Sequence, residues 1–469
     1  MFLGIDNFND NTLALKDNEN HSITYGELCD CICRFPFGES FGSTCLCLCK
    51  NTVGSVLGYL ALIENNIIPI LIGSSTDKHF IIELLNVYRP KYIWQPMDMH
   101  GEFQGEMVYS AFDYEMLGTE NESYAVHKDL ELLMCTSGST GSPKFVRYKK
   151  GNLEANARNV SIAFGWSSSE RPICDLGMHY TMGLNVINTH LYVGATVLLT
   201  TYNLMTSDFW DYIKAEQATN FTGVPFSYDI LHRLRFEKMD LPYLTTLSQG
   251  GGKLTDDMFR RFAEYADKNR KRFIASFGTT ETAARMAVLP PELALEKTGS
   301  IGYAIPESEL FLIDDNGEQI STPNTEGELC YRGPNVTMGY ASCISDLAKG
   351  DEWNGEYHTG DLAVYDPDGC YYITGRKSRF LKLLGHRVSL ERCERILSEE
   401  YGTDFACTGN DKQMVVYMTD DNLKTKVPYF LSEKTGLYSS LFCTKVIDCI
   451  PRNESGKIMY KSLEAADGR

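Results

Sequence analysis

The sequence predicts an α/β fold with a large N-terminal domain of layered mixed sheets, a β-rich subdomain and a small α+β C-terminal domain. Three observations lead to this prediction: the length of 469 residues, the alternation of strand-like and helical patterns through most of the first 300, and a change to short strands and turns after them. A single hydrophobic core stops growing at about 250–300 residues, so the chain must divide into two or three domains.

The first part of the chain alternates apolar, β-rich runs with helical patterns. This rhythm is typical of α/β layers built on largely parallel sheets. The expected elements, in order, are strand 44–49, helix 53–63, strand 67–72, strand 130–135, helix 153–164 and strand 195–200.

The pattern changes between residues 310 and 330, where short strands are separated by turns at 315–317 and at Asn324. A hairpin turn follows at 366–369. A strand at 380–384 and a helix at 390–399 then open a small α+β module that runs to the end. We place the domains at 1–376 and 380–469, with a hinge at 377–379.

The composition excludes several classes of protein. The formal net charge of −18 repels a phosphate backbone, so nucleic acid is not the expected ligand. The longest apolar stretch, 67–72, is far shorter than the roughly 20 residues of a membrane span, and a soluble protein is expected. The oligomeric state is left open.

The fifteen cysteines do not indicate a disulfide framework, because the N-terminus lacks the pattern of a secretory signal. Cys45, Cys47 and Cys49 alternate along one strand, where thiols behave as small hydrophobic groups. Their spacing is not that of a zinc site. A cytoplasmic location, where thiols stay reduced, fits best.

The strongest local motif follows strand 130–135 and precedes a helix. It is the run Thr136-Ser137-Gly138-Ser139-Thr140-Gly141-Ser142-Pro143-Lys144. Small and hydroxyl-bearing residues let the backbone approach phosphate oxygens and donate hydrogen bonds to them, and the terminal lysine adds positive charge. The spacing is not that of a Walker loop. The alternative is a flexible Ser/Gly loop, but the ordered strand–loop–Pro-Lys arrangement favours phosphate binding.

This loop resembles that of the adenylate-forming superfamily, which includes acyl- and aryl-CoA synthetases, peptide-synthetase adenylation domains and luciferase-type enzymes. The resemblance continues in order along the chain. Its further segments are 22–28, 222–225, the aromatic-Gly-x-Thr-Glu motif at 277–281, the Thr-Gly-Asp motif ending at Asp361, 375–376, 382–387 and the terminal lysine motif at 451–457.

The resemblance implies a site for ATP and Mg²⁺. The loop from Thr136 to Gly141, with Lys144, would hold the β- and γ-phosphates. Thr280 would hydrogen-bond the α-phosphate, and Glu281 would help to ligate Mg²⁺. Phe277 would lie on one face of the adenine, with Gly250, Gly251 and Gly252 lining the opposite wall. Gly278 and Thr279 would belong to the same ATP-binding site.

The C-terminal motifs complete this implied site. Asp361 would accept both ribose hydroxyls, since a carboxylate has two acceptor oxygens, and Arg376 would reach the ribose or a phosphate. Lys457 would bridge the attacking carboxylate and the α-phosphate, and so stabilise the charge of the transition state.

The resemblance also implies that a mobile C-terminal domain rotates about the hinge before the acyl group passes to a thiol. Ser378 would absorb the rotation, and Lys382 and Gly385 would border the tunnel for the thiol arm. Ser378 departs from the Asp or Lys usual in the family, and Phe145 replaces the glycine that usually follows the Pro-Lys pair.

The acid pocket of the resembling enzymes begins near residue 178. His179, Gly183 and Gly251 are the candidates here, with Asn185, Phe226 and Met286 as further lining residues. This segment lacks the aspartate that pairs with the ammonium of an amino acid, so an uncharged acyl or aryl acid is favoured. His179 as an ordinary core histidine is the alternative.

Three functions remain open. An acyl- or aryl-CoA ligase would use ATP, Mg²⁺ and CoA. A stand-alone adenylating enzyme would instead load the phosphopantetheine arm of an acyl carrier protein. The third is a nucleotide-binding protein that has lost catalysis; the presence of Lys144, Glu281, Asp361 and Lys457 argues against it.

Overall fold

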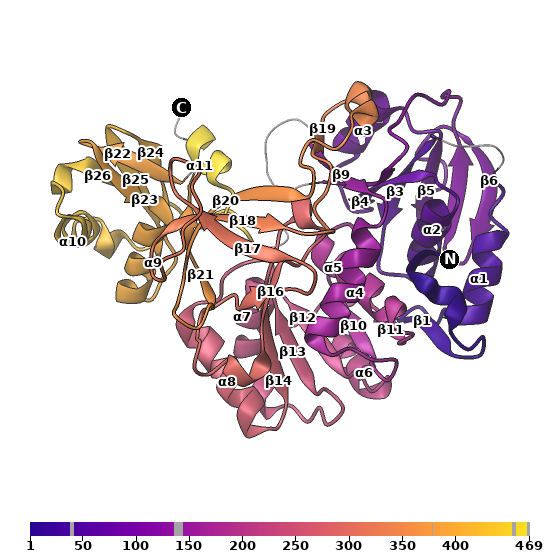
Figure 1. The fold of residues 1–469 in the computed structure, drawn as a ribbon, viewed down its shortest axis with the longest axis horizontal. Coiled ribbons are helices and arrows are strands. Elements are labelled where there is room, and N and C mark those ends of the chain that lie inside the picture. Colours follow the sequence, from indigo (N-terminus) through magenta and orange to yellow (C-terminus); the bar gives the residue numbers. More distant parts are fainter. Residues whose placement is uncertain (38–41, 136–143, 378, 453–455, 467–469) are drawn as a thin grey trace. The chain divides into compact units, whose positions relative to one another are not determined.

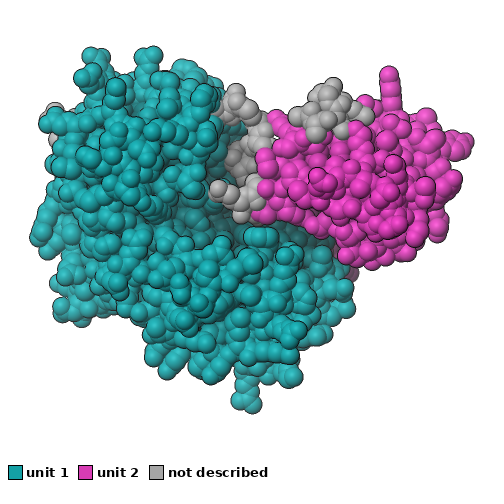
Figure 2. Space-filling model, turned by 180° about the vertical axis from the view of Figure 1, so that it is seen from behind, with its two compact units in different colours: residues 1–310, 331–357 teal, residues 311–330, 358–469 magenta. Residues whose placement is uncertain are grey.

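The computed structural model describes residues 1–37, 42–135, 144–377, 379–452 and 456–466. Packing divides the chain into two units, coloured separately in Figure 2: unit 1 is 1–310 with 331–357, and unit 2 is 311–330 with 358–469. The α/β class predicted from the sequence is confirmed. The division at 377–379 concerns a hinge motion, and it stays a prediction.

The first sheet of unit 1 has nine strands, and its six central strands run parallel. Antiparallel strands extend it at both ends. In spatial order the strands are β16 (Tyr303–Ala304), β15 (Ala287–Leu289), β14 (Arg272–Phe277), β13 (Thr246–Gln249), β12 (Asn220–Gly223), β10 (Pro172–Cys174), β11 (Val197–Leu199), β1 (Leu13–Asp17) and β2 (Ser22–Thr24).

The second sheet of unit 1 has eight strands around a parallel centre. Their order is β19 (Tyr340–Ala341), β9 (Phe145–Lys149), β8 (Leu130–Cys135), β4 (Ile68–Gly73), β3 (Thr44–Cys49), β5 (Tyr92–Pro96), β7 (Tyr114–Gly118) and β6 (Glu106–Ala111). Cys45, Cys47 and Cys49 on β3 are buried in one hydrophobic cluster, which confirms their predicted role as small core residues.

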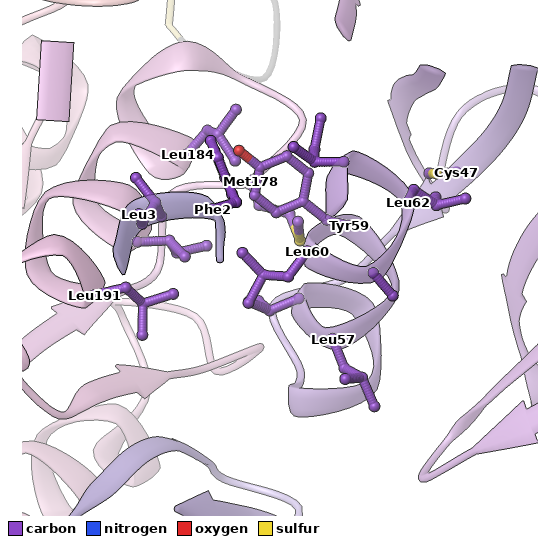
Figure 3. Close-up of a cluster of buried hydrophobic side chains, with 14 of the residues drawn as sticks. Phe2, Leu3, Cys47, Leu57, Tyr59, Leu60, Leu62, Met178, Leu184 and Leu191 are labelled. Carbon is purple, nitrogen blue, oxygen red and sulfur yellow. The ribbon is translucent and has the colours of Figure 1, made fainter. Parts of the chain in front are cut away.

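Three helices fill the space between the two sheets (Figure 1): α2 (Val53–Glu64), α4 (Asn152–Phe164) and α5 (Thr181–Tyr192). Helix α2 packs on β3, β4 and β5 and reaches β1, whereas α4 packs on β9 and α5 on β10 and β11. In Figure 3, Phe2 and Leu3 lie among side chains of α2 and α5, so the N-terminus seals this layer.

The remaining helices of unit 1 lie around these layers: α1 (Tyr25–Cys33), α3 (Lys78–Tyr88), α6 (Ser207–Ala215), α7 (Pro225–Arg233) and α8 (Asp256–Lys268). Helix α7 packs on β12 and α8 on β14. Across the described part of the chain, no helix has both the length and the apolar character needed to cross a membrane.

Unit 2 contains most of a four-stranded sheet and two smaller ones. Its strands are β17 (Glu309–Ile313), β18 (Gly327–Arg332), β20 (Glu356–Tyr365), β21 (Tyr371–Arg376), β22 (Phe380–Leu383), β23 (His386–Ser389), β24 (Ala406–Asn410), β25 (Gln413–Met418) and β26 (Phe442–Val446). Its helices are α9 (Leu390–Tyr401), α10 (Lys426–Thr435) and α11 (Tyr460–Ala466).

The predicted elements agree with the structure to within a few residues at their ends. Strands 44–49 and 130–135 are observed as predicted, and helix 53–63 ends one residue later. The expected strand 195–200 is shorter, Val197–Leu199, although residues on both sides of it are buried. The ends of strands and helices depend on turns and on the hydrogen-bond register, and these cannot be read from a run of hydrophobic residues.

Two glycines let the second sheet approach α2 closely. The indole N–H of Trp94 donates to the Gly54 carbonyl at 3.2 Å. A methyl group added at Gly58 would lie 2.0 Å from Trp94 Nε1. Because Trp94 is fully buried, it has no free space into which it could move.

Gly58→Ala is therefore expected to destabilise unit 1 by about 1–3 kcal/mol, the usual cost of overpacking a core. Gly350→Ala is the control, because its added methyl would meet only His127 at 3.8 Å, and it should change stability by less than about 0.5 kcal/mol. Urea unfolding followed by fluorescence measures both variants. Equal midpoints would contradict the close approach.

Candidate active site

The site in unit 1 is built on four neighbouring parallel strands, β10, β12, β13 and β14. Parallel strands end at the same edge of a sheet, and ligands of open α/β sheets bind beyond these carboxyl ends. His179 follows β10, Val224 follows β12, Gly250 follows β13 and Gly278 follows β14. The hydrogen-bonded register thus gathers motifs that are far apart in the sequence.

The segment after β14 carries the aromatic-Gly-x-Thr-Glu motif. Residues 277–281 are all half-buried, as expected for groups that line an accessible site. A methyl added at Gly278 would lie 1.6 Å from the Ala284 carbonyl oxygen, so only glycine fits where the chain folds back. Ala284 has a φ of 112°, a strained value of the kind that clusters at functional sites.

Glu281, Tyr340 and Lys144 form one contiguous group. The Tyr340 hydroxyl donates to Glu281 Oε1 at 2.7 Å, and Lys144 Nζ lies 3.4 Å from the centroid of the Tyr340 ring. Burial, reinforced by the Glu281 charge, raises the pKa of Tyr340, so this hydroxyl stays a donor. One side chain thereby orients both the carboxylate and the ammonium.

This group fits the predicted ligands. A carboxylate oxygen suits Mg²⁺, which proteins hold through one or two carboxylates together with substrate phosphates. The ammonium of Lys144 suits the phosphate charge. The Tyr148 hydroxyl donates a hydrogen bond to the Thr280 carbonyl at 2.8 Å and so holds the backbone of Thr280 in place. The individual roles of Lys144, Thr280 and Glu281 toward a nucleotide stay predictions.

The three glycines after β13 were predicted to line the adenine site, but the protein's own packing also requires residues without a side chain at these positions. A methyl added at Gly250 would lie 2.8 Å from Met182 Cε and 2.9 Å from Ser276 Oγ. Gly251 has a φ of +74°, and a methyl there would meet Val224 at 3.0 Å. At Gly252 a methyl would meet Pro225 at 3.0 Å. The adenine wall stays a prediction.

His179 is wedged between the two sheets. A methyl group added at Gly177 would lie 2.5 Å from His179 Cε1, and one added at Gly73 would lie 3.0 Å from the same atom. The centroids of the His179 and Tyr180 rings are 4.1 Å apart. Within the described residues its Nδ1 has no hydrogen-bond partner. Burial lowers the pKa of His179 to about 4, so the ring is neutral at physiological pH. At Gly183, an added methyl would lie 2.2 Å from the Leu176 carbonyl oxygen.

Unit 2 holds its own set of predicted residues. Asp361 and Arg376 are cross-strand neighbours on β20 and β21, and Arg376 Nε donates to Asp361 Oδ1 at 2.8 Å. The carboxylate is buried, while the guanidinium is half exposed. Thr359 Oγ1 accepts from the Asp361 amide at 3.0 Å and fixes the turn. A fixed carboxylate suits the two ribose hydroxyls.

The other predicted residues of unit 2 lie in the β22–β23 hairpin and near the C-terminus. Lys382 is exposed on β22, and Leu384 and Gly385, with φ of 50° and 83°, form the two-residue turn to β23. Lys457 is exposed after Gly456, whose carbonyl accepts from Arg452 Nη1 at 2.7 Å. Ser378 and the loop residues Thr136, Ser137, Gly138, Ser139, Thr140 and Gly141 lie outside the described residues.

Tyr340 is the member of the group of Lys144, Tyr340 and Glu281 that the sequence did not reveal. It lies 59 positions after Glu281 in a short edge strand, and no local motif marks it. Phe145, which replaces the glycine after the Pro-Lys pair, is fully buried and packs on Tyr88 with ring centroids 5.3 Å apart. This departure serves the core of the second sheet.

Fold and site together define the class of protein. The unit 1 site combines a lysine beside a conformationally fixed carboxylate with a Thr-Glu segment beyond a parallel strand. Unit 2 contributes a Thr-Gly-Asp turn paired with an arginine and a terminal lysine. This is the arrangement expected of an adenylate-forming enzyme.

Comparison with known proteins gives the family. The model of the family described as AMP-binding enzyme matches residues 6–341, and the chain belongs to this family. Oxalate–CoA ligase of Arabidopsis thaliana is 26% identical over 377 residues, which cover 76% of this chain and 71% of that protein. A 2-succinylbenzoate–CoA ligase of Bacillus licheniformis is 28% identical over 363 residues, covering 74% and 72%.

Solved structures share the fold. The o-succinylbenzoate CoA synthetase from Bacillus subtilis, in complex with its acyl-adenylate intermediate, superposes with a TM-score of 0.78 at 21% identity, covering 98% of this chain and 96% of that one. An anthranilate CoA ligase in complex with anthranoyl-AMP gives 0.77 at 18% identity, covering 97% and 94%. The predicted architecture of a large N-terminal and a small C-terminal domain is confirmed by these likenesses.

Tyr340→Phe should weaken the site without removing the ring beneath Lys144. Loss of a hydrogen bond to a charged group costs about 1.5–3 kcal/mol, so kcat/KM for MgATP should fall roughly 10- to 100-fold. Steady-state pyrophosphate release at varied MgATP measures it. Tyr243→Phe, an exposed tyrosine of the same unit, is the control. Equal losses in both variants would contradict the role of the Tyr340 hydroxyl.

The lowered pKa of His179 predicts a pH dependence of stability. Unfolded chains protonate histidine near pH 6.5, whereas folded His179 resists protonation down to about 4, so this residue withdraws stability as the pH falls from 6.5 toward 4. In His179→Gln the unfolding free energy should fall less steeply over that range. The NMR signal of the His179 imidazole is identified as the one that is missing in His179→Gln. If this signal titrates near pH 6.5 in the wild type, the argument from burial is contradicted.

Proposed function

We propose that this chain is an acid–CoA ligase. It joins a carboxylic acid to the α-phosphate of ATP with release of pyrophosphate, and then transfers the acyl group from the acyl-AMP to the thiol of CoA. The observation that carries the proposal is the group of Lys144, Tyr340 and Glu281 within a chain of the AMP-binding enzyme family.

The chemistry must overcome the repulsion between two anions, the carboxylate and ATP. Lys144 supplies positive charge at the phosphates, and its position over Tyr340 holds the ammonium in place. Thr280 offers a hydroxyl to the α-phosphate. Mg²⁺ held through Glu281 would add further positive charge at the phosphates. Because the groups are held before substrate binds, little reorganisation opposes the reaction.

Unit 2 supplies the remaining groups of the proposed reaction. Asp361 receives the ribose hydroxyls and is oriented by Arg376. Lys457 bridges the carboxylate and the α-phosphate during adenylation. Lys382 and Gly385 belong to the face used in the thiol step, after rotation at Ser378.

CoA is the favoured acceptor because the similar proteins are named as CoA ligases. A carrier protein bearing the same phosphopantetheine arm is the second candidate. A cytoplasmic location, predicted from the cysteines, forms part of the proposal. The names cover acids as different as oxalate, 2-succinylbenzoate and long-chain fatty acids, so they do not identify the acid.

The test is acid-dependent pyrophosphate release from MgATP over a panel of aliphatic, aromatic and amino acids, with and without CoA. One acid class should release pyrophosphate, and CoA should raise the turnover. Pyrophosphate without an effect of CoA would point to a carrier protein as acceptor. Nucleotide binding with no pyrophosphate from any acid would favour the protein that has lost catalysis.

Lys457→Ala should reduce pyrophosphate release about 100- to 1,000-fold, since it removes a charge aimed at the transition state. Binding of ATP, measured by calorimetry, should change much less. Lys412→Ala, on an exposed turn of the same unit, is the matched control and should keep its activity. Loss of nucleotide binding in Lys457→Ala would contradict a role confined to the transition state.

A further inference from the structure

Unit 1 contains a groove with basic walls, apart from the candidate active site. It encloses about 870 Å³ and is formed by the end of α7, the turn Phe236–Lys238 and the C-terminal part of α8. Two of the lining residues are glutamates and five are cations, which gives an excess of three positive charges in a chain whose net charge is −18. The cations are Arg233, Arg235, Lys238, Arg261 and Lys268.

The groove lies at the edge of the first sheet that is opposite to the candidate active site. Because β12, β13 and β14 are parallel, the chain must return to their starting edge after each strand. Helix α7 makes this return after β12, and α8 makes it after β13. Lys271 Nζ, just after α8, donates to the Leu241 carbonyl at 3.1 Å and so joins the two returning segments. A ligand in this groove therefore lies away from the reacting groups.

Most of the positive charge in the groove is not balanced by the protein. Arg261 is paired, because its Nε donates to Glu237 Oε1. Asp and Glu outnumber Lys and Arg by 62 to 44, so carboxylate partners are plentiful in this chain. Like charges that are gathered without counter-charges repel one another, and a bound anion removes this cost. Four cations nevertheless form no ion pair within the described part of the chain: Arg233, Arg235, Lys238 and Lys268.

Two further features distinguish the groove from an ordinary solvated surface. His232, near the end of α7, is half-buried, and its Nδ1 is closed to solvent with no hydrogen-bond partner among the described residues. A buried polar atom of this kind calls for a ligand or a water molecule. Arg235 has a φ of 55°, a left-handed conformation that is uncommon for a residue with a side chain and that clusters at functional sites.

Aromatic packing fixes the walls of the groove. Phe236, in the turn, packs on Phe262 and Tyr265 of α8, with ring centroids 6.3 and 5.4 Å apart. Tyr265 also lines the groove, and burial raises its pKa, so its hydroxyl stays a donor at neutral pH. The backbone of the groove is therefore preformed, and only the long cationic side chains need to adjust to a ligand.

We propose that this groove is a second ligand site, and that it binds a small molecule with two or more phosphate groups. A phosphate carries about 1.5–2 negative charges at neutral pH, so two phosphates balance the excess of three positive charges. Guanidinium groups bind phosphate oxygens in a bidentate manner, and ammonium groups add charge. No residue of the candidate active site lines the groove, so the inference does not depend on the proposed function.

The size and shape of the groove favour a small molecule over a macromolecular surface. The volume of about 870 Å³ lies within the range of about 300–1,000 Å³ that is usual for small-molecule sites. It leaves room for an organic part beside the phosphates. A flat bilayer surface cannot fill a concave site of this kind.

The experiment measures binding of inorganic tripolyphosphate by calorimetry, without any acid substrate. The groove variant is Arg233→Gln with Lys268→Gln. The control is Lys214→Gln with Arg260→Gln, which removes the same charge from exposed positions of unit 1 outside the groove. Tripolyphosphate also suits the predicted ATP site, so both double variants are made in the wild type and in Lys144→Ala.

In both backgrounds the groove variant should weaken one binding event about 10- to 100-fold, as expected for the loss of hydrogen bonds between charged groups. The control should change it less than about twofold. All four substituted side chains are exposed, so Tm should stay close to that of the parent protein. The imidazole NMR signal that is missing in His232→Gln should move when tripolyphosphate is added, and acetate at equal ionic strength should leave it in place.

Three results would overturn the proposal: an unchanged affinity in the groove variant, an equal loss in the control, or an unmoved His232 signal. Vesicles of phosphatidylglycerol and a polyglutamate peptide test the other kinds of partner. If either binds through Arg233 and Lys268 while tripolyphosphate does not, the site is not one for a phosphorylated small molecule. Because no turnover is measured, the outcome stands even if no acid is activated and the proposed function fails.

Discussion

The parallel hydrogen bonding of β10, β12, β13 and β14 is the constraint on which the site in unit 1 depends. Each strand ends where a functional segment begins, and the register fixes these ends at one edge of the sheet. Close packing then sharpens the arrangement. At Gly250 and Gly278, a single added methyl group would collide with a neighbouring segment, so the backbone has little freedom beyond the strand ends.

Burial sets the charge of each group around this edge. His179 is kept neutral and Tyr340 is kept protonated, while Arg285, which is buried between the Thr-Glu segment and β15, remains charged. The site thus offers donors and cations, with Glu281 as a carboxylate held by a hydrogen bond. An environment of this kind suits two anions that must approach each other, because it replaces their water shell with fixed dipoles and positive charge.

Unit 2 is organised by simpler means. A cross-strand pair orients Asp361, a two-residue turn contains Gly385, and Arg452 donates to the carbonyl of Gly456, the residue before Lys457. These local contacts form within one or two hairpins. Their geometry is therefore complete inside the unit, and the proposed reaction uses them as preformed parts.

The sequence by itself determined the family, the order of the elements and the motif residues such as Lys144, Glu281 and Asp361, because each motif is a short run with its own local geometry. Tertiary structure alone decided what surrounds them. Tyr340 meets Glu281 across 59 positions, and Arg285 meets Asn185 across 100. It also showed that the glycines after β13 serve protein packing. Contacts of such separation arise from strand order and layer packing, and no local spacing encodes them.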